Sequence, residues 1–413
     1  MKPEYVTKSD EYHTHVPNLR KMMSDGTYAE GVIGVLPTVT FPSHTTMVTG
    51  VWPAEHGIPN NHSFDPLGQH PDDWPSYFNR IKVPTLWQAA HEAGLTTASV
   101  FWPVTVNPRY IDHFIAAYPA SETVPIAKDA VVEYPAGLRK QIDKTLPENT
   151  TLDDRKFYWA LWVLKQYKPD FMTAHLTNLD HAQHISYPFS DASLKAIKQI
   201  DEWVGQLIAA ERKNYPDAII VIVSDHGFAA SDYRVNLPIL FVQNGLITPA
   251  RLSRDPGDPP VLSWKASVWV AGPTAAIVLK DPRDKDVRKK VRKLLEKAAK
   301  NPTYGIDRIL THEEVIKEGG FPDPAVAYVV SFKTGYRVGE AINGDIVEHI
   351  PHGSHGYLPT VPEMRSSFFC SGPSVAKGRE LGIIDMRQIA PTVAQMLGVH
   401  LEKAKLPPVH YEP

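Results

Sequence analysis

The chain has 413 residues, of which 43% are hydrophobic and 22% charged, and this is the ordinary composition of a globular protein. Because 46 acidic residues nearly balance 43 basic ones, for a formal net charge of −3, the composition carries no signature of binding to nucleic acid or an anionic membrane. A single cysteine, Cys370, excludes an internal disulfide framework and a cysteine-based metal site. The 18 histidines make imidazole the metal ligand to search for.

No membrane span or export signal is visible in the sequence. The longest apolar run, residues 157–164, is too short to cross a bilayer. The first twelve residues alternate charges and contain no apolar stretch, so they do not read as a signal peptide. The sequence gives no basis for assigning an oligomeric state.

Short apolar runs alternate with amphipathic stretches along the chain, which predicts an α/β fold with a mixed, mostly parallel sheet and helices on both faces. The segment 218–223, AIIVIV, is continuously apolar and is expected to be a central parallel strand buried on both faces. In chain order, helices are expected over 84–93, 157–166, 190–212, 282–300 and 389–397, and strands over 97–101, 171–176 and 218–223.

The composition changes after about residue 235, which indicates a second unit. A turn-rich stretch covers 255–260, and the expected helix over 282–300 is so highly charged that it should lie on the outside of a domain. We therefore predict an accessory subdomain over 237–348, inserted between a first part of the core, 1–236, and a C-terminal part, 349–413.

Two segments that follow apolar strands combine carboxylate and imidazole groups. In the first, Asp180 and His184 are four residues apart, which places them on one face if the segment is helical; a capping aspartate beside a surface histidine is the simpler alternative. In the second, Asp225 and His226 end the apolar strand 218–223, at the edge where open α/β sheets bind ligands. The alternative there is a turn aspartate bonded to its own backbone.

A third segment, HGSHGYLP, contains His355 between Gly353 and Gly356, and two glycines so close together indicate a close backbone approach. His352 is a competing candidate, and an ordinary loop histidine is the alternative. Together the three segments supply two aspartates and three histidines. This mixture favours zinc or a similar divalent ion, and five ligands indicate two metal ions, an arrangement typical of phosphoryl transfer.

A fourth segment, TVTFPSHTTMVTG, supplies a candidate nucleophile. Pro42 suits a first helical position, so Thr40 is expected just before a helix N-terminus. A hydroxyl there lies close to unpaired N–H groups and the positive end of the helix dipole, which suits attack on a phosphate. The simpler alternative is that Thr40 only caps the helix.

In this order, the four segments resemble the nucleotide pyrophosphatase/phosphodiesterase family of the alkaline phosphatase superfamily, over most of the chain outside the accessory region. The motif TFPSHTTMVTG resembles the nucleophile motif of that family, which implies a covalent phospho-threonine intermediate at Thr40. In VWPAEHGIPNNHSFDP, Asn61 matches the asparagine that donates to a non-bridging phosphate oxygen. Phe41, beside the nucleophile, is a candidate for stacking on an aromatic group of the substrate.

The resemblance also implies a division of the metal ligands. Asp180, His184 and His355 match the three protein ligands of one zinc. Asp225 and His226 match ligands of a second zinc, together with the oxygen of Thr40. Because family members are mostly exported, the resemblance favours a periplasmic or secreted location.

Two departures from the family pattern affect these expectations. Family members open with an apolar strand ending in Asp-Gly, whose aspartate is a ligand of the second zinc, whereas this sequence resembles the stretch just after it. We therefore expect the first strand and one ligand to be missing, and neither Glu4 nor Asp10 has the matching position. In addition, His175 stands where nucleotide-cleaving members carry an aromatic that stacks on the base, which weakens the expectation of a nucleotide substrate.

Three functions remain open at the level of sequence. The first is a two-metal phosphodiesterase or nucleotide pyrophosphatase with a small phosphate ester as substrate. The second is a phosphonate hydrolase or phosphomonoesterase of the same superfamily, although the metal motifs contain no Arg or Lys to bind the extra charge of a monoester. The third is a non-catalytic remnant that binds metal or phosphate.

Overall fold

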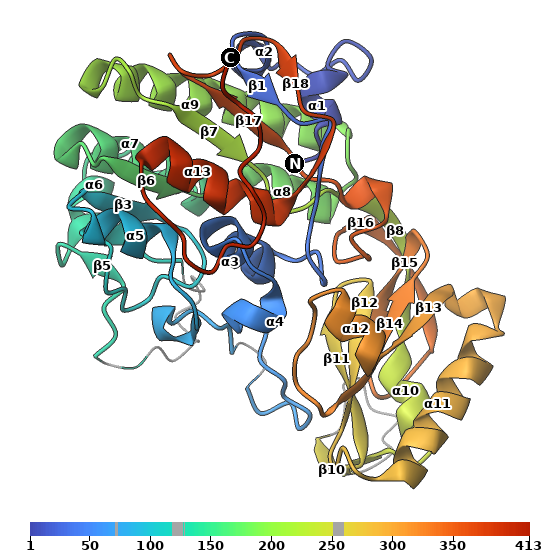
Figure 1. The fold of residues 1–413 in the computed structure, drawn as a ribbon. Coiled ribbons are helices and arrows are strands. Elements are labelled where there is room, and N and C mark those ends of the chain that lie inside the picture. Colours follow the sequence, from blue (N-terminus) through green and yellow to red (C-terminus); the bar gives the residue numbers. More distant parts are fainter. Residues whose placement is uncertain (71–72, 118–126, 128, 251–259) are drawn as a thin grey trace.

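Two four-stranded sheets form the larger part of the molecule, and helices cover both of their faces (Figure 1). The structure is a computed structural model that describes residues 1–413 except 71–72, 118–126, 128 and 251–259. The first sheet has the order β18-β1-β17-β7 and the second the order β5-β4-β3-β6. Their strands are β1 (Thr27–Tyr28), β7 (Ile220–Val223), β17 (Phe368–Ser371), β18 (Arg379–Glu380), β3 (Thr97–Val100), β4 (His113–Ile115), β5 (Glu133–Tyr134) and β6 (Phe171–Ala174).

The apolar stripes of the helices explain which face each helix covers. On α9, Ile197 is fully buried and packs together with Ile200 and Val204 against α2 and the first sheet, as the predicted stripe requires. On the opposite face, Ile389 and Ala394 of α13 pack with α3 and α5. The helices of the core are α1 (Glu4–Thr7), α2 (Pro17–Ser24), α3 (Thr40–Thr49), α4 (Pro53–His56), α5 (Leu86–Glu92), α6 (Leu138–Asp143), α7 (Leu152–Tyr167), α8 (Asn178–Ile185), α9 (Asp191–Asn214) and α13 (Ile389–Leu397).

Most predicted elements are confirmed with shifts of a few residues, but the prediction for 218–223 is wrong in two respects. Strand β7 pairs antiparallel with β17, so it is not a parallel strand. Its four residues are only partly buried, because β7 is the last strand of its sheet and a cavity lies on its other side. A continuous apolar run shows that a segment belongs in the core, but it does not specify strand direction or whether both edges are paired.

A second unit, at the lower right of Figure 1, contains an antiparallel sheet of order β11-β12-β14-β13. Its core packs the sheet against α10 and α11, with Val291 and Leu295 of α11 fully buried. The elements are β9 (Ile247–Pro249), β10 (Val261–Trp264), β11 (Ala266–Ala271), β12 (Thr274–Leu279), β13 (Ile306–Thr311), β14 (Val326–Phe332), α10 (Leu237–Gln243), α11 (Lys285–Ala299) and α12 (His312–Lys317). Most of the turn-rich stretch 255–260 lies outside the described residues.

The two units are joined by a three-stranded sheet of order β15-β8-β16, formed by β8 (Ala229–Asn236), β15 (Gly335–Gly339) and β16 (Val347–Ser354). These strands come from both sides of the predicted boundaries, so the domain limits given above stay a prediction. A short ladder of β2 (Gly31–Ile33) with β19 (Ile383–Asp385) and four 3₁₀ turns complete the elements, the turns covering Phe78–Arg80, Pro302–Tyr304, Pro362–Met364 and Met386–Gln388.

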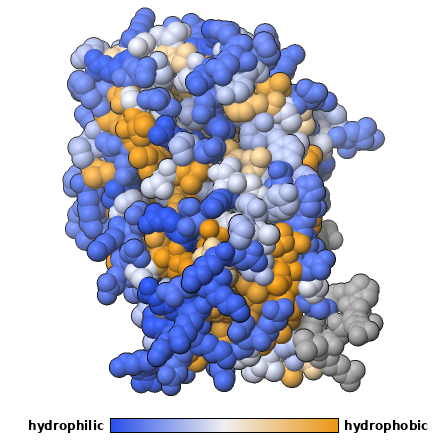
Figure 2. Space-filling model, turned by 90° about the vertical axis from the view of Figure 1, so that its right-hand side faces the viewer, coloured by the Kyte–Doolittle hydropathy of each residue, from blue (hydrophilic) through white to orange (hydrophobic). Residues whose placement is uncertain are grey.

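The hydropathy of one face of the molecule is shown in Figure 2. The face in Figure 2 is mainly hydrophilic, with hydrophobic side chains grouped in a few patches. Among the described residues, no helix combines the length and the apolar character that crossing a membrane requires.

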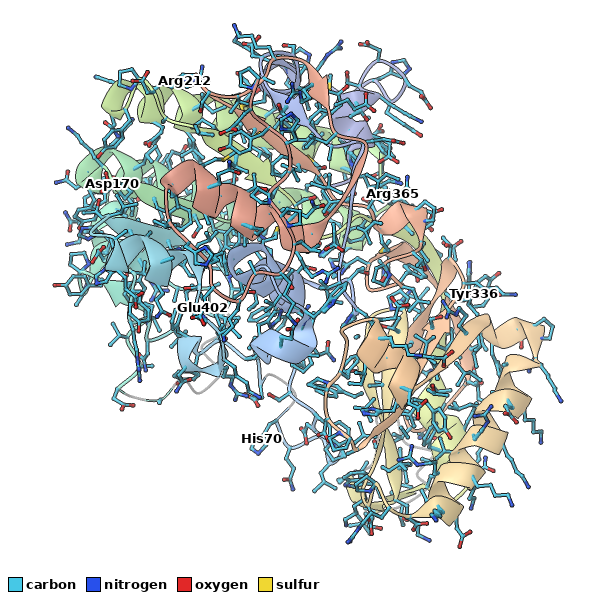
Figure 3. All side chains as sticks on the ribbon, viewed as in Figure 1. His70, Asp170, Arg212, Tyr336, Arg365 and Glu402 are labelled. Atoms are coloured by element: carbon cyan, nitrogen blue, oxygen red, sulfur yellow. The ribbon has the colours of Figure 1, made fainter. Side chains whose placement is uncertain are left out.

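Figure 3 marks Asp170 and Arg212 at the end of the core that is far from the second unit, and Arg365 near the place where the two units join.

Candidate active site

The predicted site residues come together beyond the carboxyl ends of β6 and β7. Helix α8, which follows β6, carries Asp180 and His184, so these two residues have the helical spacing that the sequence suggested. Asp225 and His226 follow β7 directly after one serine, and His355 is the first residue after β16. The strand ends therefore deliver all five side chains to one region, as expected for an open α/β sheet.

The first candidate metal cluster consists of Asp180, His226 and His355, whose ligand atoms lie within 4.8 Å of one another. The Nε2 atoms of His226 and His355 are each 3.9 Å from Asp180 Oδ1. His184 stands beside this cluster, with its Nε2 3.5 Å from Asp180 Oδ2. The structure thus places the predicted ligands of one metal together and adds His226 to them.

Hydrogen bonds orient the imidazole rings of this cluster. The Nδ1 atom of His355 is 3.1 Å from the carbonyl oxygen of Thr38, and the Nδ1 atom of His226 is 3.0 Å from that of Gly227. A carbonyl can only accept, so each Nδ1 carries a proton and donates it, and in the neutral ring Nε2 then has a free lone pair. Second-shell bonds of this kind fix the tautomer of a metal-ligating histidine.

The second candidate cluster consists of His44, His175 and Asp225, again with ligand atoms within 4.8 Å. His44 lies one helical turn after Thr40 on α3, and its Nδ1 is 2.9 Å from the carbonyl oxygen of Thr40 and 3.6 Å from Asp225 Oδ2. The His44 and His175 ring centroids are 4.3 Å apart. Asp225 links the two clusters, because its Oδ2 is also 3.0 Å from His226 Nε2.

Burial and charge determine the protonation of these groups. Burial alone would raise the pKa of Asp225, but the neighbouring His226 and His44 lower it well below its usual range. Burial lowers the pKa of His355 well below its usual range, and the nearby His226 and His184 add to this effect. At neutral pH Asp225 is therefore ionised and His355 is neutral, and these are the forms that bind a metal ion.

Two polar atoms at the first cluster fit a divalent cation better than they fit the protein alone. Asp180 Oδ1 and His226 Nε2 are buried and form no hydrogen bond of good geometry with the described residues, although His226 Nε2 lies 3.0 Å from Asp225 Oδ2. An unpartnered buried polar atom is unfavourable by about 1–3 kcal/mol, and coordination to a metal would remove this penalty. Two carboxylates with several imidazoles form a donor set that suits zinc or a similar first-row ion.

The structure places Thr40 at the start of α3, so the helix begins two residues before the expected Pro42. The backbone N–H of Phe41 donates to Asn61 Oδ1 at 2.8 Å, and Asn61 N donates to Asn60 Oδ1 at 2.8 Å. With Oδ1 occupied, the Asn61 carboxamide directs its Nδ2 donor away from the Phe41 amide. Thr40 and Asn61 are therefore held next to each other at a helix N-terminus, where backbone N–H groups favour an anion.

The ring of Phe41 lies in a small apolar cluster. It is only 6% exposed and contacts Trp74, with ring centroids 5.1 Å apart. Its backbone amide, rather than its ring, reaches the site in this arrangement. Stacking of Phe41 on a substrate therefore stays a prediction.

Two residues of the second cluster were not identified as ligands from the sequence. His175 was noted only as a missing stacking aromatic, whereas in the structure it faces His44 and Asp225. The available signal for His44 was its spacing of four from Thr40, which places it on the same helix face. Among the other candidates, His352 lies outside both clusters, and Asp10 forms an exposed ion pair with Arg20 at 2.6 Å.

Two of the glycines that flank the ligands permit close backbone contacts. A Cβ atom on Gly353 would lie 2.3 Å from the carbonyl oxygen of Gln183 in α8, and one on Gly227 would lie 2.0 Å from that of Glu363. Distances under 3.0 Å do not occur for real Cβ atoms. Gly353 therefore allows β16 to lie against α8, which brings His355 to Asp180, and the close approach predicted for this segment is confirmed.

Solved structures with a similar fold are ectonucleotide pyrophosphatases/phosphodiesterases. Human ectonucleotide pyrophosphatase/phosphodiesterase 5 matches with a TM-score of 0.68 at 19% sequence identity, covering 96% of this chain and 93% of that one. An inactive variant of the murine protein, in complex with AMP, matches with a TM-score of 0.66 at 19% identity, covering 97% of this chain and 94% of that one. At this identity the likeness concerns the fold, and it confirms the predicted α/β class.

The names of two sequence relatives also refer to phosphodiesterases. Ectonucleotide pyrophosphatase/phosphodiesterase family member 3 of Bos taurus is 26% identical over 227 residues, which is 52% of this chain and 23% of that protein. A venom phosphodiesterase of Crotalus durissus collilineatus is 26% identical over 230 residues, 53% of this chain and 24% of that protein. The alignments thus span about a quarter of the length of these relatives. The family profile described as Type I phosphodiesterase / nucleotide pyrophosphatase matches residues 1–358, so the chain belongs to this family.

Proposed function

We propose that the protein hydrolyses phosphate diesters or pyrophosphates with two divalent metal ions, zinc being the metal that the donor set favours. The observation that carries this proposal is the pair of clusters, Asp180–His226–His355 and His44–His175–Asp225, linked through Asp225 and His226 beside the N-terminus of α3. Metal ions bound there would polarise the ester and lower the pKa of the attacking hydroxyl.

In the proposed reaction, Thr40 is the nucleophile. Its Oγ forms a bond to phosphorus while the bond from phosphorus to one ester oxygen breaks, and the departing alcohol leaves with a proton. Water then attacks the phospho-threonine, releases the phosphate monoester and restores the Thr40 hydroxyl. Asn61 Nδ2 donates to a non-bridging oxygen and stabilises the negative charge that develops there.

A diester is favoured over a monoester by the charge around the site. Lys156 Nζ donates a hydrogen bond to Thr177 Oγ1, near the carboxyl end of β6. The same ammonium group is already paired with Asp153 Oδ1 at 2.7 Å. It therefore offers little uncompensated positive charge for the second negative charge of a monoester. A nucleotide-containing substrate is supported by the family and by the AMP complex of the murine relative. The names of the relatives, which refer to ectoenzymes and venom, support a location outside the cytoplasm.

The decisive experiment compares wild type with Thr40→Ala on an aryl phosphodiester, with metal content measured on both. Loss of at least a thousandfold in kcat with unchanged metal content would support the nucleophile. Thr248→Ala, a replacement of an exposed threonine on β9, is the matched control and should keep full activity. Near-full activity in Thr40→Ala would overturn the assignment, and a higher kcat/KM for the aryl monoester would favour a phosphomonoesterase.

A further inference from the structure

The loop that follows β3, residues 101–107, contains three residues other than glycine in the left-handed region of the backbone. They are Phe101, Val104 and Asn107, with φ of 59°, 60° and 53°. Asparagine adopts this conformation comparatively readily, but for a β-branched residue such as Val104 it is rare and unfavourable. Strained residues persist only where the surrounding structure holds them, and they are concentrated at functional sites. We call residues 101–107 the β3 loop.

The strained valine lies directly behind the nucleophile. Val104 is fully buried, and it packs in the small apolar cluster that contains Phe41 and Ile58. Phe41 is the second residue of α3 and follows Thr40, the proposed nucleophile, in the chain. The backbone N–H of Phe41 is the group that donates to Asn61 Oδ1. Val104 therefore supports the side chain of the residue whose backbone links Thr40 to Asn61.

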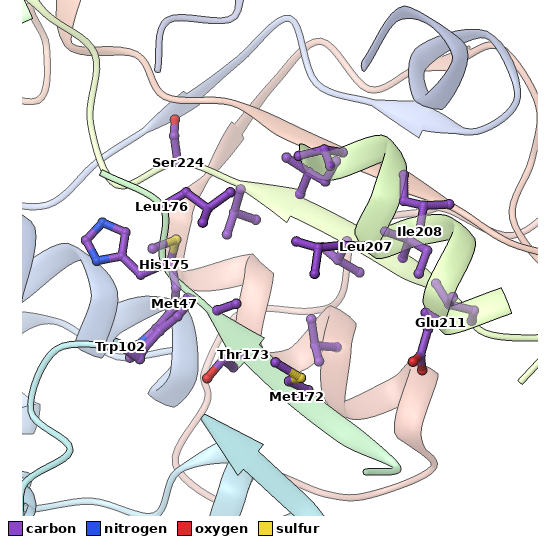
Figure 4. Close-up of a pocket in the computed structure, with 18 of the residues that line it drawn as sticks. Met47, Trp102, Met172, Thr173, His175, Leu176, Leu207, Ile208, Glu211 and Ser224 are labelled. Carbon is purple, nitrogen blue, oxygen red and sulfur yellow. The ribbon is translucent and has the colours of Figure 1, made fainter. Parts of the chain in front are cut away.

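A second residue of the β3 loop, Trp102, contacts the same helix one turn further on. Its Nε1 donates to the carbonyl oxygen of His44 at 3.3 Å, and the two rings meet edge to face with centroids 4.7 Å apart. Figure 4 shows Trp102 next to Met47 of α3, close to His175, and Trp102 and Met47 belong to one apolar cluster. The β3 loop thus contacts the first turn of α3 through Val104 and the second turn through Trp102.

The first residue of the loop is connected to the other half of the site. The Nζ atom of Lys156 lies 4.2 Å from the centroid of the Phe101 ring, and the same Nζ donates to Thr177 Oγ1. Thr177 directly precedes α8, the helix that carries Asp180. The β3 loop therefore lies against the helix of the nucleophile and, through Lys156, is connected to the helix of a candidate metal ligand. A loop in this place can fix the position of the nucleophile in the site.

We propose that Val104 is a positioning residue for the nucleophile. Its side chain holds the ring of Phe41, and through the Phe41 backbone it keeps Thr40 and Asn61 in the geometry that attack on phosphorus requires. This inference rests on the proposed function, because the reaction of Thr40 is what Val104 serves. Glycine would adopt the same backbone conformation without strain, but it has no side chain to contact Phe41. The contact with Phe41 thus explains why a valine occupies an unfavourable conformation here.

The test compares Val104→Gly with Val104→Ala in the full chain, by urea unfolding, by kcat on an aryl phosphodiester and by hydrogen exchange of the Phe41 amide. Because glycine tolerates a positive φ and alanine does not, the unfolding equilibrium constant of Val104→Gly should be about three- to tenfold smaller than that of Val104→Ala. The order of kcat should be the reverse. A misplacement of about 1 Å can lower the rate by roughly 100-fold, so we expect kcat at least tenfold lower in Val104→Gly than in Val104→Ala, with little change in KM. The Phe41 amide should exchange at least tenfold faster in Val104→Gly.

Asn107→Gly and Asn107→Ala are the matched controls, because Asn107 has the same backbone conformation in the same loop but is exposed and bonds to Val131 rather than to α3. Glycine should again give the more stable variant, while both controls keep the kcat and the Phe41 exchange of wild type.

The proposal is overturned if Val104→Ala is both the less stable and the less active of its pair, as a purely structural role requires. It is also overturned if Val104→Gly is the less stable variant or keeps the kcat of wild type. Wild type that does not hydrolyse phosphodiesters would contradict the proposed function instead. In that case the exchange of the Phe41 amide decides whether Val104 holds the start of α3: equal exchange in the two Val104 variants overturns the proposal.

Discussion

The rings of His226 and His355 lie stacked, with centroids 3.5 Å apart and planes inclined by only 8°. Each ring is held through Nδ1 by a backbone carbonyl, and each directs Nε2 to within 3.9 Å of Asp180 Oδ1. Two positively charged rings would repel each other at this separation. At most one of the two rings therefore carries a second proton, and the lowered pKa of His355 keeps that ring neutral. A cation bound to both Nε2 atoms would take the place of such a proton, so the pair is a test of metal binding.

Replacing His355 with Ala should weaken zinc binding at the first cluster. The substitution removes a ligand atom directly, so we expect a loss of roughly 100-fold or more, the upper end of what losing an outer-shell partner causes. Isothermal titration of the metal-free protein with zinc measures this affinity. His352→Ala, three residues earlier on β16 and outside both clusters, is the matched control. Equal zinc affinity of the two variants would argue against His355 as a ligand.

Replacing Asn61 should lower kcat with little effect on folding. Removal of one donor to a developing oxyanion reduces kcat by roughly 10²–10³-fold. Asn61→Asp is the informative variant, because it keeps an oxygen to accept the Phe41 N–H but loses the Nδ2 donor. Both Asn61→Ala and Asn61→Asp should show this reduction in kcat on an aryl phosphodiester. If Asn61→Asp kept its kcat, the role of Asn61 would be limited to holding the Phe41 backbone.

Replacing Gly353 with Ala should separate β16 from α8. The new Cβ would lie 2.3 Å from the carbonyl oxygen of Gln183, so one element must move and carry His355 away from Asp180. Steric overpacking of this kind destabilises a protein by about 1–3 kcal/mol, and we expect zinc affinity to fall as well. Gly344→Ala is the control for backbone strain alone, because Gly344, unlike Gly353, has a positive φ, of 90°, and no atom lies within 4 Å of its Cβ position. Gly344→Ala should lower the free energy of unfolding without changing zinc affinity.

The sequence was sufficient to single out candidate ligands that lie close together along the chain. The spacing of Asp180 and His184 specified a shared helix face, and the polar pair Asp225–His226 at the end of an apolar strand marked the edge of the sheet. The grouping of the ligands could not be predicted in this way. His226 reaches both Asp180 and Asp225 because strands β7 and β16 and helix α8 meet in space, and residue spacing carries no information about that packing.

The same limit explains why His44 and His175 were not grouped from the sequence and why the direction of β7 was predicted wrongly. His175 joins His44 because α3 packs beside the end of β6, a tertiary contact between segments about 130 residues apart. For residues 218–223, the apolar run correctly indicated a core strand. The antiparallel partner β17 comes nearly 150 residues later, so the direction of pairing depended on a distant segment.

A buried histidine outside the site gives a prediction for the pH dependence of stability. His56 is fully buried, its Nδ1 accepts from the amide of Ile58 at 3.2 Å, and its Nε2 lies 3.1 Å from Thr46 Oγ1, which fits a neutral ring. Burial lowers its pKa from 6.5 to about 3. Because the folded-state pKa lies below the unfolded one, the contribution of His56 to stability is complete above pH 6.5 and is lost as the pH falls toward 3.

Between pH 7.5 and pH 5, wild type should therefore lose about 2 kcal/mol of unfolding free energy through this group, at 1.36 kcal/mol per pH unit below 6.5. Urea unfolding at both pH values measures the loss. His56→Gln, whose amide can still donate to Thr46 and accept from Ile58, should lose correspondingly less between the two pH values. His410→Gln, a replacement of an exposed histidine, should keep the wild-type dependence. An identical pH dependence in His56→Gln and wild type would show that the buried ring is not the group that titrates.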